Sequence, residues 1–222
     1  ELRFELFFGH GVAQKRIGDP AGRENLLGRA VDAAREAGGG ERLAQAILAA
    51  TGLAFSTLLD VDDRLVALID EALAAVQHEG VRARLLAAKA LELAWADDDH
   101  IRFELSDAAV ALARRHGDDT VLMAVLGQRQ IATWTPASLA DRYAETSELM
   151  DLARASGDPF QLALAMRMRL HPLIESTEIR EARALMIEAQ QLAADLGQPE
   201  IDRYLVHGEV QLAIIGGDLD AA

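Results

Sequence analysis

"LARRHGDDTVL" (residues 112–122), "LARASGDPFQL" (152–162) and "LAADLGQPEID" (192–202) begin forty positions apart and share one pattern. Each has a helix-forming stretch, a glycine, a polar residue and a second helix-forming stretch. Glycine just past a helix end adopts the left-handed conformation at little cost. An aspartate after it can cap the next helix, and Pro159 and Pro199 suit a first helical turn. The pattern therefore predicts a helix–turn–helix unit that repeats along the chain.

The glycines of this pattern mark a period near forty residues, which is typical of a helical solenoid. A second set of turn signals lies half a period away, beginning at Gly18-Asp19 and ending at Gly217-Asp218, 199 residues later. Two turns in each period imply two antiparallel helices in each repeat. The landmark glycines, with gaps of 42, 37, 40 and 40 residues, are Gly38, Gly80, Gly117, Gly157 and Gly197.

Small and aliphatic residues recur at fixed distances before each landmark glycine. Spacings of three and four place them on one face of a helix, so we expect a buried stripe where helices approach closely. Eight positions before the glycine stand Ala30, Ala72, Ala109, Leu149 and Ala189; five before it stand Ala33, Ala75, Leu112, Leu152 and Leu192; four before it stand Ala34, Val76, Ala113, Ala153 and Ala193.

These observations predict an all-α fold with about five helix pairs of ~40 residues plus one extra helix, forming a single repeat domain over residues 1–222. We interpret the chain as a fragment of a larger protein, and we expect a longer connection around 52–62. Helices are expected near 2–17, 21–37, 41–55, 62–78, 81–96, 99–116, 119–134, 137–156, 159–175, 179–196 and 199–216.

The composition limits the function classes that need be considered. The net charge of −14 argues against direct contact with nucleic acid, whose phosphates require a Lys/Arg surface. The absence of cysteine removes disulfides and thiolate metal sites and is consistent with a cytoplasmic location. No apolar run reaches the length of a membrane-spanning helix, so we expect no membrane contact.

Two short motifs resemble the tetratricopeptide repeat. Gly11-Val12-Ala13 followed by Gly18-Asp19 resembles the "LGxAYxxxGD" core of that family, with Gln14 where an aromatic residue is usual. Gly217-Asp218 with Ala222 resembles the "GDxxxA" start of its second helix. The resemblance implies a right-handed α-α superhelix, although the forty-residue period exceeds the usual 34.

A longer similarity, covering essentially the whole chain, is to the repeat region of large bacterial ATP-dependent LuxR-type transcriptional regulators. The resemblance implies a regulatory module with an ATPase before it and a helix-turn-helix domain after it. Class III nucleotide cyclases that carry the same ATPase and repeats are similar over this region too. The stretches that carry it are "GDPAGRENLLGRAVDAAREAG" (18–38), "LVALIDEALAAV" (65–76), "ARLLAAKALELAWADD" (83–98), "DAAVALARRHGD" (107–118), "ATWTP" (132–136) and "LGQPEIDRY" (196–204).

By analogy with tetratricopeptide repeats, the helix before each half-period turn lines a concave groove. Trp95 and Trp134 occupy equivalent positions, where they form either an aromatic groove floor or packing between repeats. The polar and aromatic residues expected in the groove are Arg84, Trp95, Gln130, Trp134, Arg167, His171, Tyr204 and His207.

No catalytic or metal-binding pattern is recognisable. The acidic runs 60–63 and 97–99 lack the glycine and distal glutamate of a calcium loop, so we interpret them as helix caps. The six histidines have no zinc-type spacing on one helix, but the repeat could bring His171 and His207 onto one face.

The sequence thus predicts a non-enzymatic sensor module that needs no cofactor in this segment. Its expected partner is a protein or a small-molecule inducer in the groove, whose binding signals to ATPase and DNA-binding domains outside the chain. A structural scaffold that self-associates is the alternative, as is the repeat region of an ATPase-linked cyclase.

Overall fold

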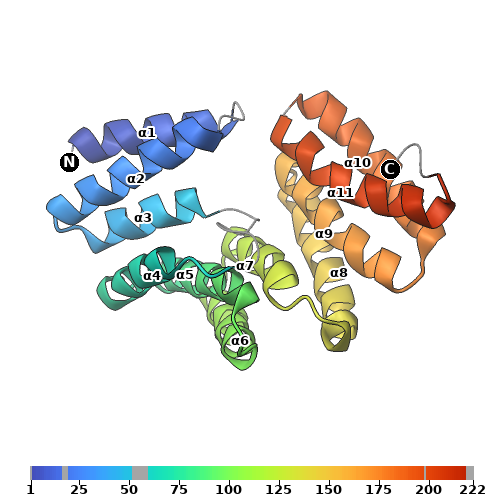
Figure 1. Ribbon diagram of the computed structural model, residues 1–222, viewed down its shortest axis with the longest axis horizontal. Coiled ribbons are helices and arrows are strands. Elements are labelled where there is room, and N and C mark those ends of the chain that lie inside the picture. Colours follow the sequence, from blue (N-terminus) through green and yellow to red (C-terminus); the bar gives the residue numbers. More distant parts are fainter. Residues whose placement is uncertain (1, 17–19, 52–59, 198, 219–222) are drawn as a thin grey trace. The chain divides into compact units, whose positions relative to one another are not determined.

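The computed structural model describes the chain except for residues 1, 17–19, 52–59, 198 and 219–222. Within the helices, the side chains of 14–16, 20–24, 199–200 and 203–204 are also left undescribed. The described part is entirely helical and contains no strand, which confirms the all-α prediction (Figure 1).

The chain divides into two compact units, Glu1–Thr133 and Trp134–Ala222. The prediction of one domain over 1–222 stays a prediction, because each unit is described by itself. Unit 1 contains α1 (Leu2–Arg16), α2 (Pro20–Glu36), α3 (Gly40–Ala50), α4 (Asp63–Ala75), α5 (Glu79–Glu92), the 3₁₀ turn η1 (Leu93–Trp95), α6 (His100–His116) and α7 (Asp119–Ala132). Unit 2 contains η2 (Pro136–Ser138), α8 (Leu139–Ser156), α9 (Pro159–Glu175), α10 (Ile179–Leu196) and α11 (Pro199–Gly216).

Within each unit, every helix packs against the next one in the chain. The odd-numbered helices form a second series of contacts: α1 with α3, α3 with α5 and α5 with α7 in unit 1, and α9 with α11 in unit 2. One helix of each pair therefore stacks on its counterpart in the next pair, as repeated helix pairs require.

The repeat is regular from α5 onward. The helices α5, α7, α9 and α11 begin at residues 79, 119, 159 and 199, each forty positions after the last. All eleven α-helices of the described part lie near their predicted positions. The clearest differences are at helix ends: α3 ends at Ala50, α4 at Ala75, α5 at Glu92 and α7 at Ala132, against predicted ends at 55, 78, 96 and 134. Trp134 therefore lies in the connection after α7 rather than on the helix.

Four of the five landmark glycines end helices as predicted. Gly38, Gly117, Gly157 and Gly197 have φ values of +69°, +77°, +67° and +59°, in the left-handed region. Gly80 does not mark a turn, because it is the second residue of α5 and lies against the imidazole of another helix. The prediction was wrong for Gly80, because the sequence alone does not distinguish a glycine that close packing requires from one that a turn requires.

The capping chemistry of the repeat is also confirmed. Asp118 accepts hydrogen bonds from the backbone N–H groups of Thr120 and Val121, at 2.8 and 3.4 Å. Asp158 accepts the equivalent bonds at 2.8 and 3.4 Å, and Pro159 is the first residue of α9. The half-period turn signal at Gly18-Asp19 lies outside the described residues.

The small-residue stripe lies in the buried core of both units. All ten residues at the positions eight and four before a landmark glycine are at most 4% exposed. The position five before it is mixed: Ala33 and Leu112 are buried, Leu152 and Leu192 half-buried and Ala75 exposed. The stripe is thus two positions wide, because the third lies at its edge.

A polar contact also recurs every forty residues, at the position ten residues after the start of α5, α7, α9 and α11. At each place the side chain bonds to the preceding helix, which fixes the two helices of a pair to one another. The contacts are Lys89 to Asp70 (2.5 Å), Arg129 to Asp107 (2.7 Å), Arg169 to the Tyr143 carbonyl oxygen (2.6 Å) and Glu209 to Gln190 (2.7 Å).

Candidate functional site

The eight candidate groove residues divide between the two units. Unit 1 holds three of them: Arg84 on α5 is half-buried, Trp95 at the end of η1 is 39% exposed and Gln130 on α7 is 5% exposed. Burial lowers the pKa of the Arg84 guanidinium. In unit 2, the Tyr204 side chain lies outside the described residues, and the other four are Trp134, Arg167, His171 and His207.

Three of the unit 2 candidates form an aromatic group. The ring centroids of Trp134 and His171 are 4.7 Å apart, and those of His171 and His207 are 5.3 Å apart. Trp134 and His207 are 6.4 Å apart and meet edge to face. The expectation that the repeat brings the two histidines onto one face is confirmed.

Two polar side chains extend this group through helical spacing. Arg167 precedes His171 by four residues on α9, and Gln211 follows His207 by four residues on α11, so each pair shares a helix face. Because α9 packs against α11, the two faces meet. We call Trp134, Arg167, His171, His207 and Gln211 the Trp134 cluster.

The polar character of the cluster departs from the rest of the repeat. Its four helical residues occupy two positions on each of α9 and α11, the eighth and the twelfth after the first residue of the helix. In unit 1 the same positions are small or apolar and buried, as in an ordinary helical core. The eighth position is Ala87, Gly127, Arg167 and His207 along the chain, and the twelfth is Leu91, Ile131, His171 and Gln211.

The environment of His171 keeps its imidazole neutral. Burial lowers its pKa to about 3, and electrostatic repulsion from Arg167, His207 and Arg142 acts in the same direction. The side chain of Gln211 raises the pKa of His171, but by less than burial and repulsion lower it. Nδ1 of His171 and Oε1 of Gln211 are both buried without a hydrogen bond of normal geometry among the described residues.

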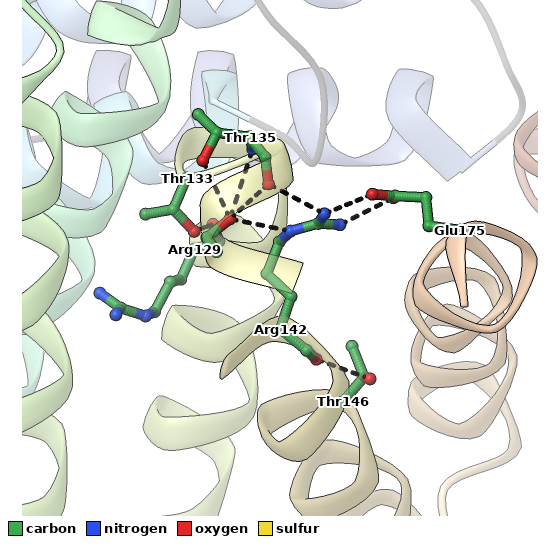
Figure 2. A network of polar contacts seen from close by, with 7 residues as sticks. Arg129, Thr133, Thr135, Arg142, Thr146 and Glu175 are labelled. Atoms are coloured by element: carbon green, nitrogen blue, oxygen red, sulfur yellow. Dashed lines mark hydrogen bonds and ion pairs between the residues drawn. The ribbon is translucent and has the colours of Figure 1, made fainter. Parts of the chain in front are cut away.

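Behind the cluster, Arg142 on α8 is held by a network of polar contacts (Figure 2). Its side chain is almost fully buried and forms a two-point ion pair with Glu175, at 2.9 and 2.5 Å. It also donates to the Ser138 hydroxyl at 3.1 Å and to the Thr135 carbonyl oxygen at 3.3 Å. The guanidinium carbon lies 5.8 Å from the Trp134 ring centroid.

The Arg142 network fixes the segment that carries Trp134. Its bonds to Thr135 and Ser138 tie the connection before α8 to that helix, and its pair with Glu175 ties α8 to the end of α9. Such charge-assisted, two-point contacts hold a fixed geometry. The network therefore positions the indole beside the histidines.

Sequence reasoning did not select Arg142, although a repeat signal was present. Arg102 stands forty residues earlier and donates in the same way to the Ala94 carbonyl oxygen, at 2.5 Å. Polar residues, like the glycines and alanines, recur at the forty-residue period, and Arg102 and Arg142 form such a pair.

The two histidines of the Trp134 cluster lie near the Arg167 and Arg142 guanidinium groups. No group of three or more metal-ligating side chains occurs in the described part of the chain. The neighbouring guanidinium groups also oppose a cation. The capping interpretation of the acidic runs is confirmed at Asp62, which caps α4 by accepting from the Leu65 N–H at 3.0 Å. At the second run the cap residue Asp99 makes no side-chain capping bond, and Asp98 accepts from the His100 N–H at 3.0 Å instead.

No helix in the described ranges has the length and apolar character needed to cross a membrane.

In comparisons with known proteins, no protein-family model matches the chain, and no curated protein matches it.

Proposed function

We propose that the chain is a tetratricopeptide-like binding module, a right-handed α-α superhelix that recognises a ligand at the Trp134 cluster. Its role is regulatory rather than catalytic, and it needs no cofactor of its own. In the parent protein, a cytoplasmic LuxR-type regulator, occupancy of the cluster signals to ATPase and DNA-binding domains outside this segment.

The observation that carries the proposal is the change of residue type at repeat-equivalent positions. Helix stacking at these positions requires only small and apolar side chains, as Ala87 and Leu91 show by being 2% and 0% exposed. Placing Arg167 and His171 there removes apolar contacts, and Nδ1 of His171 is buried without a hydrogen bond of normal geometry, which costs stability. A cost of this kind is expected where polar groups are retained for binding.

The position of the cluster supports a signalling role. Its side chains come from α9, α11 and the connection before α8, so a bound ligand contacts three segments of unit 2 together. A ligand shifts a conformational equilibrium only by its differential affinity for the two states. In a solenoid, a small change at the α9–α11 contact alters the stacking of successive pairs.

A structural scaffold that self-associates is the second candidate function. It is favoured by apolar side chains on the surface of α11, where Val206, Ile214 and Ile215 are 50%, 53% and 49% exposed. Such residues also suit the docking of a further repeat. The resemblance to cyclase-linked repeats concerns the output domain and leaves the role of the cluster unchanged.

The test is a thermal-shift screen of the 222-residue protein against a panel of anionic, neutral and cationic metabolites. A ligand at 100 times its Kd stabilises the folded state by about 2.7 kcal/mol, which is a readily measured rise in Tm. His171→Leu, which places the Leu91-type residue in the cluster, should abolish the rise. Trp95→Phe, which changes an exposed aromatic residue of unit 1, is the control and should leave it intact.

Absence of any stabilising ligand in the panel would contradict the binding proposal. So would a ligand whose effect is equal in wild type and His171→Leu, because it would bind elsewhere. Concentration-dependent self-association without ligand binding would instead favour the scaffold.

A further inference from the structure

We propose that the Trp134 cluster binds a small organic anion, with a carboxylate between Arg167 and the two histidines and a flat apolar body against the Trp134 ring. This inference rests on the proposed function and adds the chemical class of the ligand.

Local charge is the first argument. The chain as a whole carries a net charge of −14, yet the fixed charges that act on His171 are the guanidinium groups of Arg167 and Arg142. The Glu175 carboxylate at the end of α9 is held by the two-point pair with Arg142. A local positive site on an acidic protein selects anions and repels cations.

The available hydrogen-bonding atoms are the second argument. Nδ1 of His171 is buried without a hydrogen bond of normal geometry, and it becomes a donor when the imidazole is protonated. Oε1 of Gln211 on the facing helix is likewise buried without a partner of normal geometry, and the exposed His207 imidazole on α11 carries a ring N–H donor. Donors on both α9 and α11 can therefore contact one carboxylate group.

Access and shape are the third argument. Trp134 remains 38% exposed although its ring contacts both histidines, and His207 is exposed. A partly exposed indole ring binds flat apolar groups well. The cluster thus offers a stacking surface beside a cationic one, which fits an aromatic carboxylate better than inorganic phosphate.

Binding of an anion should be accompanied by proton uptake. His171 is neutral in the free protein because burial, the Arg167 guanidinium on α9, the His207 imidazole on α11 and the Arg142 guanidinium on α8 all oppose its protonation. A carboxylate beside the ring raises the imidazole pKa. Affinity therefore falls as pH rises, because the proton is less available.

Isothermal titration calorimetry of the full 222-residue chain with three matched probes tests the inference. The probes are 2-naphthoate, 2-naphthamide and (2-naphthyl)methylammonium, which share the flat body and differ in charge. We expect 2-naphthoate to bind about tenfold more tightly than the amide, and the cation to bind most weakly. Two buffers of different ionisation enthalpy at one pH should give different heats for the naphthoate, which measures the proton taken up.

Substitutions locate the binding. Arg167→Gln should weaken 2-naphthoate about tenfold and leave 2-naphthamide unchanged. Arg154→Gln is the matched control, because it removes the same charge from an exposed position of unit 2 outside the cluster. His207→Gln changes an exposed side chain of the cluster and should weaken naphthoate even if the Arg167 variant folds poorly.

Equal affinity for the naphthoate and the amide would overturn the anion inference, as would equal loss in Arg167→Gln and Arg154→Gln. Absence of binding by all three probes would overturn it as well. The proposed function survives these results if the wider panel contains a neutral ligand that His171→Leu fails to bind.

Discussion

Replacement of His171 by leucine should make the protein more resistant to acid. The pKa of His171 is about 3 in the folded protein against 6.5 in the unfolded chain, so the unfolded state binds a proton that the folded state excludes. The folded state therefore has its full stability, as far as His171 is concerned, above about pH 6.5, and it loses stability as pH falls from 6.5 towards 3.

The size of the effect follows from the two pKa values. Each unit of pH below the unfolded pKa costs about 1.36 kcal/mol of unfolding free energy, until the folded pKa is reached. At pH 5, which lies about 1.5 units below 6.5, His171 therefore destabilises the wild type by about 2 kcal/mol relative to pH 7. His171→Leu should gain this amount relative to wild type over the same interval.

Urea unfolding at pH 7, 6 and 5 measures the difference. A Trp95→Phe background leaves Trp134 as the fluorescent tryptophan, so the signal reports unit 2. The comparison between pH values cancels the constant effect of the new side chain. His100→Gln, which removes an exposed imidazole from unit 1, controls for the loss of a histidine.

A difference between His171→Leu and wild type that stays constant from pH 7 to pH 5, within about 0.5 kcal/mol, would refute this reasoning. It would mean that His171 is protonated as readily in the folded protein as in the unfolded chain. A smaller advantage for the variant at pH 5 than at pH 7 would mean that the folded state favours the protonated imidazole.

Three further substitutions test the packing. Ala109→Leu overpacks a fully buried stripe position and should cost about 1–3 kcal/mol, so an unchanged Tm would argue against the contact. Gly40→Ala places a Cβ 2.7 Å from the Cβ of Ala75 and against its backbone, and should cost about 1–3 kcal/mol in chemical denaturation. Glu175→Gln leaves the buried Arg142 charge without its carboxylate and should cost about 3 kcal/mol; equal stability of variant and wild type would show that the pair is weak.

The helices and their caps were predictable because the interactions that define them are local. A left-handed glycine such as Gly117, followed by the cap Asp118, involves residues within a few positions of one another. Alanines at three- and four-residue spacing identified the buried stripe for the same reason. Gly80 shows the limit, because its role depends on the imidazole of His116, 36 positions away.

The candidate site was predictable only in part. Repeat arithmetic placed His171 and His207 on stacked helices, and the structure brings their rings to 5.3 Å. The arithmetic could not separate them from Gln130, which occupies an expected groove position and is buried in unit 1. It also missed Arg142, whose role is set by a partner 33 residues away on another helix.

The sequence by itself determined where the helices begin and which face of each is buried, since backbone conformation and amphipathic periodicity depend on near neighbours. Only the tertiary structure decided that polar residues of α9 and α11 meet beside Trp134 and that His171 stays neutral. The ring contacts join residues 36 to 73 positions apart, and the pKa depends on burial and on the summed field of side chains from three helices.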